Sequence, residues 1–561
     1  MKDRFYLGLL IAVVALVYGN SLRNGFTMDD DLYVSGNPQV TAPTLRGLFG
    51  PHRITKVFRP LTFTSFAVNW FMDRGQPRGF HVVNLLLHAA GACLLYLLLQ
   101  NLLALSANGK TVAFAAALLF AVHPIHTEAV SSIVGRAELL AAGFLISAWL
   151  LHLRNRELPA LLCFVAALLS KESAVAFLPL VVVGDYARGK LRPYFQYAGI
   201  AAITAVYLGI LWSVQGGRLG VEALTISRID NPLAALSPTW RILNALRIDW
   251  KYVALQFYPA TLSCDYSFNE IPLYFDLRHT LPWAIAGVAL IGAWIWAVRE
   301  KRSAWALAGG MYFAGFAATA NVVIPSGTIM GERLAYFPSA GFCLLIASAW
   351  AWPYMRQRRA AWGVLAVIVA ALGLRTAVRN PDWKDNLSLY SAAVRAVPGS
   401  AKMHANLGAA YLEANQRELA RKELQTALQI YPNFPQAFES LGLLESRDGN
   451  YQAAGRMLEA AFYSTRREDN PNYDDMAVNL AAVYMQTSHI EGALQLLDRE
   501  IAESPGYGRA WANRAVIRYK RGENAAARTD AETALRLDPG NQQARNLMQL
   551  LNAAAPSSLL R

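Results

Sequence analysis

Long apolar stretches alternate with short polar segments over the first two-thirds of the chain, a pattern typical of proteins that cross a membrane many times. A helix needs about 20 apolar residues to span the hydrocarbon core of a bilayer. The sequence predicts eleven transmembrane helices, over residues 5–22, 82–104, 111–122, 138–153, 159–170, 173–184, 194–213, 281–298, 304–324, 334–353 and 360–376. Several of these stretches are shorter than a full span, so we expect their ends to be partly buried in protein.

A further stretch, over 241–262, is amphipathic, and we interpret it as interfacial or re-entrant. Every basic short loop then falls on one side of the membrane, which the positive-inside rule identifies as cytoplasmic. These loops carry Lys2, Arg4, Lys110, Arg154, Arg156, Arg188, Lys190, Arg192, Arg299, Lys301, Arg302, Arg356, Arg358 and Arg359. The chain after residue 376 is expected on the outer side, with the loops 23–80, 123–138, 170–173, 214–280 and 321–336.

Residues 401–542 repeat with a period close to 34 residues, which is the period of tetratricopeptide repeats. A small residue recurs where the two helices of each repeat must approach closely, at Gly408, Gly442, Ala481 and Ala515. Four units stay in phase, apart from a five-residue insertion around 466–471, and residues 383–398 are predicted to form an extra leading helix. We therefore predict an all-α fold, with a polytopic membrane domain over 1–380 and a tetratricopeptide-repeat α-solenoid over 381–555.

Charge divides along the chain in the same way. The formal net charge is +13, but residues 1–380 carry 32 Lys and Arg against 18 Asp and Glu, whereas residues 381–561 carry 20 against 21. Nucleic-acid binding needs a basic exposed surface, and the part predicted to be soluble has none. The four cysteines set no disulfide framework, and no CxxC or HExxH spacing indicates a zinc site.

Charged residues gather in the predicted outer loops, at membrane edges where they cost free energy unless paired or functional. Asp29, Asp30 and Asp31 follow the first span, and two adjacent pairs, Lys171–Glu172 and Glu332–Arg333, lie beside apolar stretches. A third group comprises His123, His126, Glu128, Arg136 and Glu138. Loop ion pairs, a solvated acidic cap or, for the histidines and a carboxylate, a metal site are alternatives to a lined cavity.

A cavity of this kind suits a lipid-linked substrate with a phosphate head group. Arginine and lysine neutralise the charge that develops on a phosphate leaving group, and an aspartate accepts the proton of an attacking hydroxyl. The sequence contains no GxGxxG or Walker loop, and neither step requires a nucleotide or redox cofactor.

Several segments, in this order, resemble those of one known family: MDDDLYVSGNP, FRPLTFTSFAVNW, GFHVVNLLLHAAGACLLYLLL, HPIHTEAVSSIVGRAELLAA, SKES, CDYSFNEIPL, GERLAYFPSAGFCLL and RNPDWKDNLSLY. The chain resembles the transmembrane-and-tetratricopeptide-repeat family of protein O-mannosyltransferases, in the GT-C superfamily of polyprenyl-phosphate-sugar glycosyltransferases. The resemblance implies a sugar donor on a polyprenyl phosphate, a Ser/Thr hydroxyl as acceptor, and a catalytic acid in the first outer loop.

Carried onto this sequence, the resemblance implies that Asp29 and Asp30 are the catalytic acidic pair. Asp31 stands where the family usually has an apolar residue, so the choice among the three acids stays open. The remaining family motifs fall on Arg136 and Glu138, Lys171 and Glu172, Glu332 and Arg333, and Asp265 and Tyr266. We expect these residues, with His123, His126 and Glu128, to bind the phosphate and sugar of the donor, with Arg333 as the main phosphate contact oriented by Glu332.

The sequence therefore predicts a metal-independent membrane enzyme that moves mannose or another hexose from a polyprenyl phosphate to a protein held by the repeats. Two alternatives remain: a GT-C enzyme that acts on a lipid or polysaccharide, and a non-catalytic scaffold that recruits partners through its repeats. We expect a bacterial inner-membrane protein with periplasmic repeats and an undecaprenyl-phosphate donor. A eukaryotic chain would instead use a dolichyl-phosphate donor and have its repeats in the lumen of the endoplasmic reticulum.

Overall fold

The computed structural model describes residues 2–52, 55–104, 106, 108–215, 226–467 and 473–553, and these residues contain helices and no strand. The chain divides into two compact units, Met1–Ser400 and Ala401–Arg561. We expected the boundary at residue 380. Residues 381–400 lie in the first unit, where η9 (Asn380–Lys384) packs against η1 (Gly19–Arg23) and against α17.

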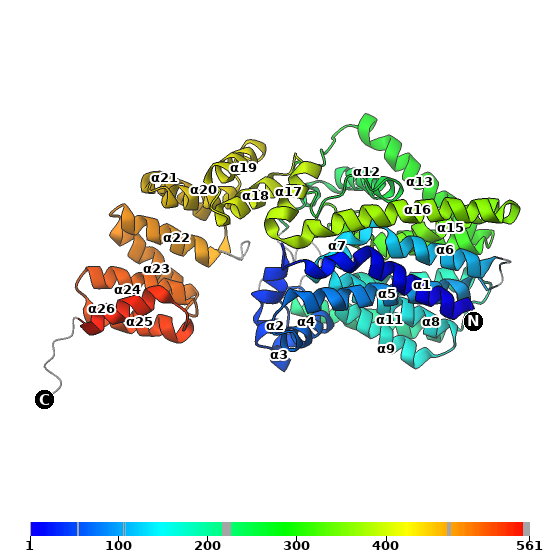
Figure 1. The fold of residues 1–561 in the computed structure, drawn as a ribbon, viewed down its shortest axis with the longest axis horizontal. Coiled ribbons are helices and arrows are strands. Elements are labelled where there is room, and N and C mark those ends of the chain that lie inside the picture. The colour runs from blue at the N-terminus through cyan, green and yellow to red at the C-terminus, as the bar shows by residue number, and fades with distance from the viewer. Residues whose placement is uncertain are drawn as a thin grey trace. The chain divides into compact units, whose positions relative to one another are not determined.

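Each of the eleven apolar stretches contains a helix in the first unit (Figure 1). These helices are α1 (Lys2–Tyr18), α5 (Pro77–Leu102), α6 (Gly109–Val122), α8 (Arg136–Leu153), α9 (Glu157–Ser170), α10 (Phe177–Ala187), α11 (Tyr194–Val214), α13 (Leu277–Arg299), α14 (Ser303–Phe316), α15 (Pro338–Arg356) and α16 (Arg358–Arg379). Between or after them lie α2 (Pro38–Thr41), α3 (Leu45–Leu48), α4 (Pro60–Met72), α7 (Thr127–Ser131), α12 (Pro238–Phe257) and α17 (Asn386–Ala396).

The count of eleven spans is not confirmed. Among the described residues, six helices are long and apolar enough to cross a membrane, or seven if one bent pair counts as a single span. Some of the others are too short for a full span: the 14 residues of α9 rise about 21 Å, less than the ~30 Å hydrocarbon core. The bent pair is α6 and the helical segment Pro124–Ser131, which ends in α7; they meet at 51° because Pro124 keeps His123 out of the helical conformation.

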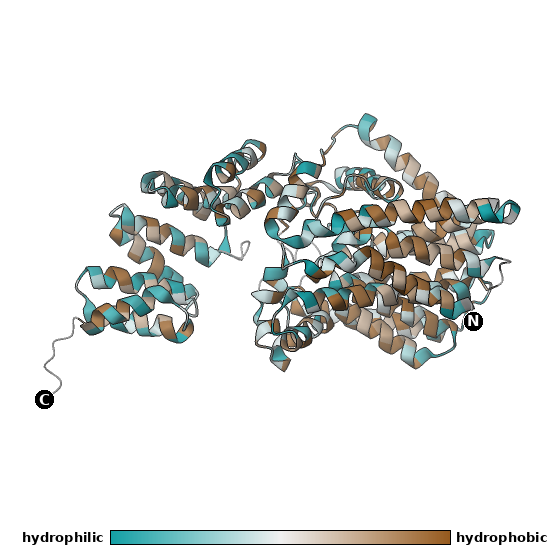
Figure 2. Cartoon of the chain, viewed as in Figure 1, coloured by the Kyte–Doolittle hydropathy of each residue, from teal (hydrophilic) through white to brown (hydrophobic). Residues whose placement is uncertain are grey.

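Helix α6 is the centre of the first unit. It is apolar on every side, as a fully buried helix must be, and it packs against α1, α5, α15 and α16. By contrast, α11 and α13 expose large apolar side chains such as Trp212 and Val288, which suits contact with lipid hydrocarbon (Figure 2). Helix α12 buries one stripe, including Ile248 and Tyr252, and is not a candidate span, in keeping with its amphipathic sequence.

The described residues of the second unit form four helix pairs followed by one further helix, as the 34-residue period predicts: α18 (Ala401–Glu413), α19 (Arg417–Ile430), α20 (Pro435–Arg447), α21 (Tyr451–Tyr463), α22 (Tyr473–Gln486), α23 (Ile490–Glu503), α24 (Gly508–Lys520), α25 (Asn524–Leu537) and α26 (Gln542–Ala553). Small residues do lie where helices touch: a Cβ on Gly408 would be 2.5 Å from Cγ of Leu424. Most of the predicted insertion, residues 468–471, lies outside the described part of the chain.

Candidate functional site

The three acids after α1 lie in one tight loop and have different surroundings. Asp30 is fully buried, and its carboxylate accepts hydrogen bonds from the backbone N–H of Thr27 (2.9 Å) and of Val134 (3.0 Å). Burial raises the pKa of Asp30 to about 7, and the neighbouring charge of Asp29 raises it too, while the backbone N–H groups lower it. Asp30 therefore ties the loop to the chain around residue 134.

Asp29 and Asp31 lie on more open sides of this loop. The Asp29 side chain is one-third exposed and its Oδ2 is 3.6 Å from Nη1 of Arg333. Asp31 is exposed, and its Oδ1 accepts a hydrogen bond from the Ser35 hydroxyl at 2.7 Å. Asp29 is thus the member of the acidic run that combines solvent access with contact to a cation.

Arg333 pairs with a residue from another segment, not with its neighbour in sequence. Its Nη1 donates to Oε1 of Glu128 at 2.9 Å, and its backbone N–H donates to Oε2 of the same carboxylate at 2.8 Å. The expectation that Glu332 orients Arg333 is wrong, because Glu128 and Asp29 are the carboxylates beside the guanidinium. Glu128 is buried, where the lower dielectric strengthens the attraction between its carboxylate and Arg333.

Glu332 belongs to a separate buried group. Its Oε1 accepts from the hydroxyl of Tyr266 at 2.6 Å and from the backbone N–H of Ser263 at 2.7 Å, and its Oε2 accepts from Nη2 of Arg379 at 2.8 Å. The neighbouring Asp265 accepts the backbone N–H of Ser267 at 2.8 Å, as a side chain that shapes a turn does. Tyr266 and Glu332 together fix the loop before α13 to the start of η8 (Glu332–Ala335).

The adjacent residues Lys171 and Glu172 likewise pair with different partners. Lys171, at the end of α9, forms a buried ion pair with Glu138 of α8. Glu172 receives both Nε (3.1 Å) and Nη2 (2.7 Å) of Arg59, a bidentate pair. Burial alone would raise the pKa of Glu172, but the Arg59 charge outweighs it and holds that pKa at about 2. The expected Lys171–Glu172 pair is therefore not formed.

Arg59 is a charged residue of this region that the sequence analysis missed. It comes directly before Pro60, the first residue of α4, in the segment FRPLTF. The signal was present, because an arginine before an apolar helix in a predicted outer loop is the same pattern that marked Lys171. Its partner 113 positions along the chain was not visible from sequence.

Arg136 does not face a cavity, contrary to expectation. It is fully buried and surrounded by neutral acceptors: Oδ1 of Asn84 (2.9 Å), Oδ1 of Asn69 (2.7 Å) and the carbonyls of Phe80 (3.0 Å) and Ser65 (3.2 Å). Its guanidinium also stacks on two rings, with centroids 4.9 and 5.3 Å away. Arg136 joins α4, α5 and α8, which makes it a packing residue.

The two histidines of the HPIH segment form hydrogen bonds inside the protein. His123 Nε2 lies 2.9 Å from the carbonyl of Gln256, and His126 lies 2.6 Å from the Ser339 hydroxyl and 2.9 Å from the Phe120 carbonyl. Both are buried. Within the described ranges, no group of three or more histidine, cysteine or carboxylate side chains could hold a metal ion.

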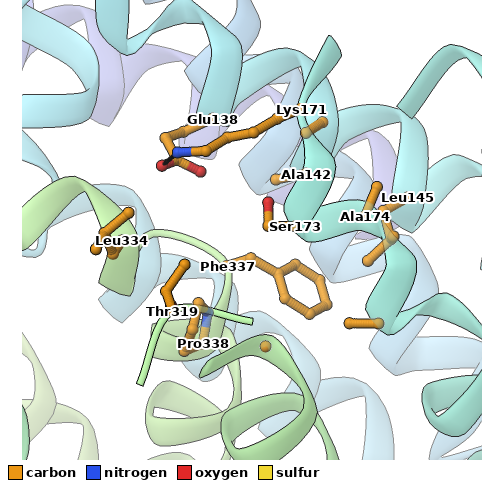
Figure 3. Close-up of a pocket in the computed structure, with 13 residues that line it drawn as sticks. Glu138, Ala142, Leu145, Lys171, Ser173, Ala174, Thr319, Leu334, Phe337 and Pro338 are labelled. Carbon is orange, nitrogen blue, oxygen red and sulfur yellow. Dashed lines mark hydrogen bonds and ion pairs between the residues drawn. The ribbon is translucent and has the colours of Figure 1, made fainter. Parts of the chain in front are cut away.

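Seven charged residues therefore form what we call the charged cluster: Asp29, Arg59, Glu128, Glu138, Lys171, Glu172 and Arg333. The parts of the cluster interact electrostatically, because the negative charge of Glu138 favours the charged forms of Lys171, Arg59 and Arg333. A pocket of about 440 Å³, mouth included, begins at the Glu138–Lys171 pair (Figure 3). Its further walls are Ala141, Ala142, Leu145, Ser173, Ala174, Ala176, Gly315, Thr319, Leu334, Phe337 and Pro338. The pocket is thus charged at one end and mostly apolar elsewhere.

Comparison with known proteins agrees with the resemblance seen in the sequence. The tetratricopeptide repeat family matches residues 401–434. The chain is 31% identical to protein O-mannosyl-transferase F38B6.6 of Caenorhabditis elegans, over 76% of this chain and 63% of that protein. It is 27% identical to TMTC3 of Mus musculus (95% and 64%) and 26% identical to TMTC4 of Homo sapiens (75% and 65%), both named protein O-mannosyl-transferases.

The chain spans slightly less than two-thirds of the length of each of these relatives. The alignment with TMTC3 nevertheless takes in 95% of this chain. The resemblance inferred from the sequence is thereby confirmed: over most of its length, the chain is similar to proteins named TMTC protein O-mannosyl-transferases.

Proposed function

We propose that this protein is a membrane glycosyltransferase that moves one hexose, mannose in the first instance, from a polyprenyl phosphate to a serine or threonine hydroxyl of a protein. The names of the relatives support protein O-mannosylation. The GT-C type of membrane domain and the lipid-linked donor rest on the family resemblance and on the chemistry of the charged cluster.

The observation that carries this proposal is the approach of Asp29 to Arg333. Oδ2 of Asp29 is 3.6 Å from Nη1 of Arg333, with both side chains about one-third exposed. Glu128, Glu138 and Glu172 each hold a cation at hydrogen-bond distance or closer. Asp29 lies just beyond that distance, so its carboxylate is the one in the cluster best placed to accept a proton.

In the reaction we propose, the acceptor hydroxyl oxygen attacks C1 of the sugar. The bond between C1 and the phosphate oxygen breaks with its electrons on the phosphate, and the hydroxyl proton passes to Asp29. The polyprenyl phosphate leaves with one more negative charge than it carried as the sugar ester. Arg333 stabilises that developing charge, because its fixed planar fork binds two phosphate oxygens. Every atom of the reaction comes from donor and acceptor.

The pocket beside Lys171 supports a donor with a lipid tail. An isoprenoid chain needs an apolar wall, which Leu145, Phe337 and Pro338 provide, and its phosphate needs a cation at one end, which Lys171 provides. The repeats are proposed to hold the acceptor protein, since helical repeats offer an extended binding surface. We place the repeats and the charged cluster on the outer side of the membrane.

The test is transfer by purified full-length protein in lipid vesicles containing polyprenyl-phosphate mannose, with a Ser/Thr-rich acceptor protein analysed by glycopeptide mass spectrometry. We expect hexose on acceptor hydroxyls, and we expect Asp29→Asn to lower kcat by about 100-fold, a typical loss for a positioned base. Asp31→Asn is the matched control, because it removes a neighbouring exposed acid. Equal activity of all three proteins would refute the role of Asp29, and hexose found only on lipid would identify a lipid-modifying enzyme instead.

A further inference from the structure

The loop that carries Asp29 is hydrogen-bonded to residues 380–386, which end at the first residue of α17. The backbone N–H of Gly25 donates to the carbonyl of Lys384 at 2.9 Å, and Nδ2 of Asn24 donates to the carbonyl of Asn380 at 3.0 Å. The backbone N–H of Met28 donates to Oδ1 of Asn386 at 2.8 Å. Three hydrogen bonds thus join residues that are more than 350 positions apart in sequence.

The hydrogen bond at Met28 holds an uncommon backbone conformation. The φ of Met28 is +52°, in the left-handed region that side chains other than glycine rarely adopt. A residue held there turns the chain sharply, so the direction of the next side chain, Asp29, depends on Met28 keeping this conformation. Conformations of this kind persist only where surrounding contacts hold them, and the Asn386 amide oxygen is such a contact.

We infer that Asn386 is a positioning residue for Asp29. By accepting the Met28 N–H it keeps the loop in the conformation that presents the Asp29 carboxylate beside Arg333. Asn386 touches neither Arg333 nor the pocket in the described contacts, so its effect is exerted through the backbone of residue 28. This inference rests on the proposed function, because it assigns Asn386 a part in the same proton transfer.

Three substitutions distinguish the hydrogen bond of Asn386 from other properties of this segment. Asn386→Leu keeps a side chain of similar size but loses the accepting oxygen. Asn386→Asp keeps an accepting oxygen at the same distance from the backbone. Lys384→Leu changes an exposed side chain in the same segment whose contact with the loop is made by its backbone carbonyl alone. The three variants therefore separate loss of the hydrogen bond from a general disturbance of the segment.

The experiment measures kcat, the KM for polyprenyl-phosphate mannose and the folded yield of the full chain in vesicles. We expect Asn386→Leu to lower kcat on the order of 10-fold, because small misplacements of reacting groups cost that much or more, with KM for the donor unchanged. Asn386→Asp and Lys384→Leu should stay within about 3-fold of the unaltered protein. If Asn386→Leu is not recovered folded, Asn386→Gln, which shifts the oxygen by one methylene, takes its place with the same expectation.

Asp29→Asn is measured in parallel so that failure of the proposed function can be distinguished from failure of the positioning role of Asn386. If the unaltered protein transfers no hexose, or Asp29→Asn is fully active, the proposed function or its base is wrong. If Asp29→Asn is impaired while Asn386→Leu keeps full kcat, only the positioning role is wrong. A rise in donor KM with unchanged kcat in Asn386→Leu also overturns it, because that pattern indicates ground-state binding.

Discussion

Arg333 donates to Glu128, 205 positions away, while its neighbour Glu332 accepts from Arg379, 47 positions away. Two residues joined by a peptide bond therefore serve two separate groups. Arg333 reaches the charged cluster and is partly exposed, whereas Glu332 is completely buried. Arg333 is therefore accessible to a substrate, whereas Glu332 is placed to hold the fold together.

The first prediction concerns that pair. Arg333→Ala should abolish transfer and weaken binding of polyprenyl phosphate, whereas Arg333→Lys should retain binding but lower kcat, because lysine keeps the charge without the fork. Glu332→Gln should act on stability, since it weakens the bonds to Arg379 and Tyr266. Donor binding and melting temperature, measured for all three proteins, separate these effects. A Glu332→Gln protein of normal stability that cannot bind donor would contradict the division.

The second prediction uses the buried Asp30. Its pKa is raised to about 7 in the folded protein against 3.8 for an ordinary aspartate, chiefly by burial. The folded state therefore binds more protons between these values, so this group stabilises the fold below about pH 4 and the stabilisation is lost as the pH rises through 7. We expect Asp30→Asn to flatten that part of the pH dependence.

The measurement for Asp30 is the melting temperature in detergent from pH 4 to pH 8, compared between the unaltered protein and the variant. Because many groups titrate in this interval, the difference between the two curves carries the result. Asp31→Asn, an exposed neighbour, should leave the curve unchanged. Parallel curves for Asp30→Asn and the unaltered protein would show that Asp30 does not titrate in this range.

The third prediction concerns Arg136. Arg136→Gln should lower the melting temperature and the folded yield, because it orphans several buried acceptors, each costing about 1–3 kcal/mol when unpaired. The molecules that do fold should keep most of their kcat. Arg154→Gln, at an exposed arginine just beyond the other end of α8, is the matched control. Loss of donor binding in well-folded Arg136→Gln would show instead that Arg136 belongs to the donor site.

The fourth prediction is topological. Within the first unit, Glu138 and Lys171 of the charged cluster lie at the ends of α8 and α9 that are remote from the basic loop of Arg154 and Arg156. Reporters fused after Arg156, Arg192 or Arg359 should therefore read as cytoplasmic, and reporters within the repeats as external. Protease protection in sealed vesicles provides an independent readout. Cytoplasmic repeats would put acceptor and charged cluster on opposite sides and defeat the proposed reaction.

Local pattern was enough to predict the helices and the repeats. The 34-residue period and the apolar stretches are local signals, and the helices of both units follow them. The number of membrane spans stays a prediction, because several of the apolar helices, such as α9, are shorter than the bilayer core is thick. Apart from Arg59, the residues of the charged cluster were found from sequence, but their partners were not, since contacts between residues 33 to 205 positions apart leave no trace in one sequence.

Backbone geometry explains why adjacent charges were wrongly paired. Lys171 is extended, with φ −159° and ψ 141°, and successive side chains of an extended chain point to opposite sides. Glu332 and Arg333 begin a helical turn, where neighbouring residues do not face each other. The same geometry sends Lys171 to Glu138 and Glu172 to Arg59. Adjacency in sequence is thus evidence against direct pairing at such positions.

The divergence of neighbouring charges also governs how this protein can change over evolutionary time. A change at Glu128 would remove the ion-pair partner of Arg333, and a change at Glu172 would remove that of Arg59, whereas Glu332 and Arg333 belong to different ion pairs. Covariation among homologous chains should consequently link distant segments in preference to motif neighbours. A motif copied intact into another scaffold would carry only half of each ion pair, and its charges would arrive without their counterparts.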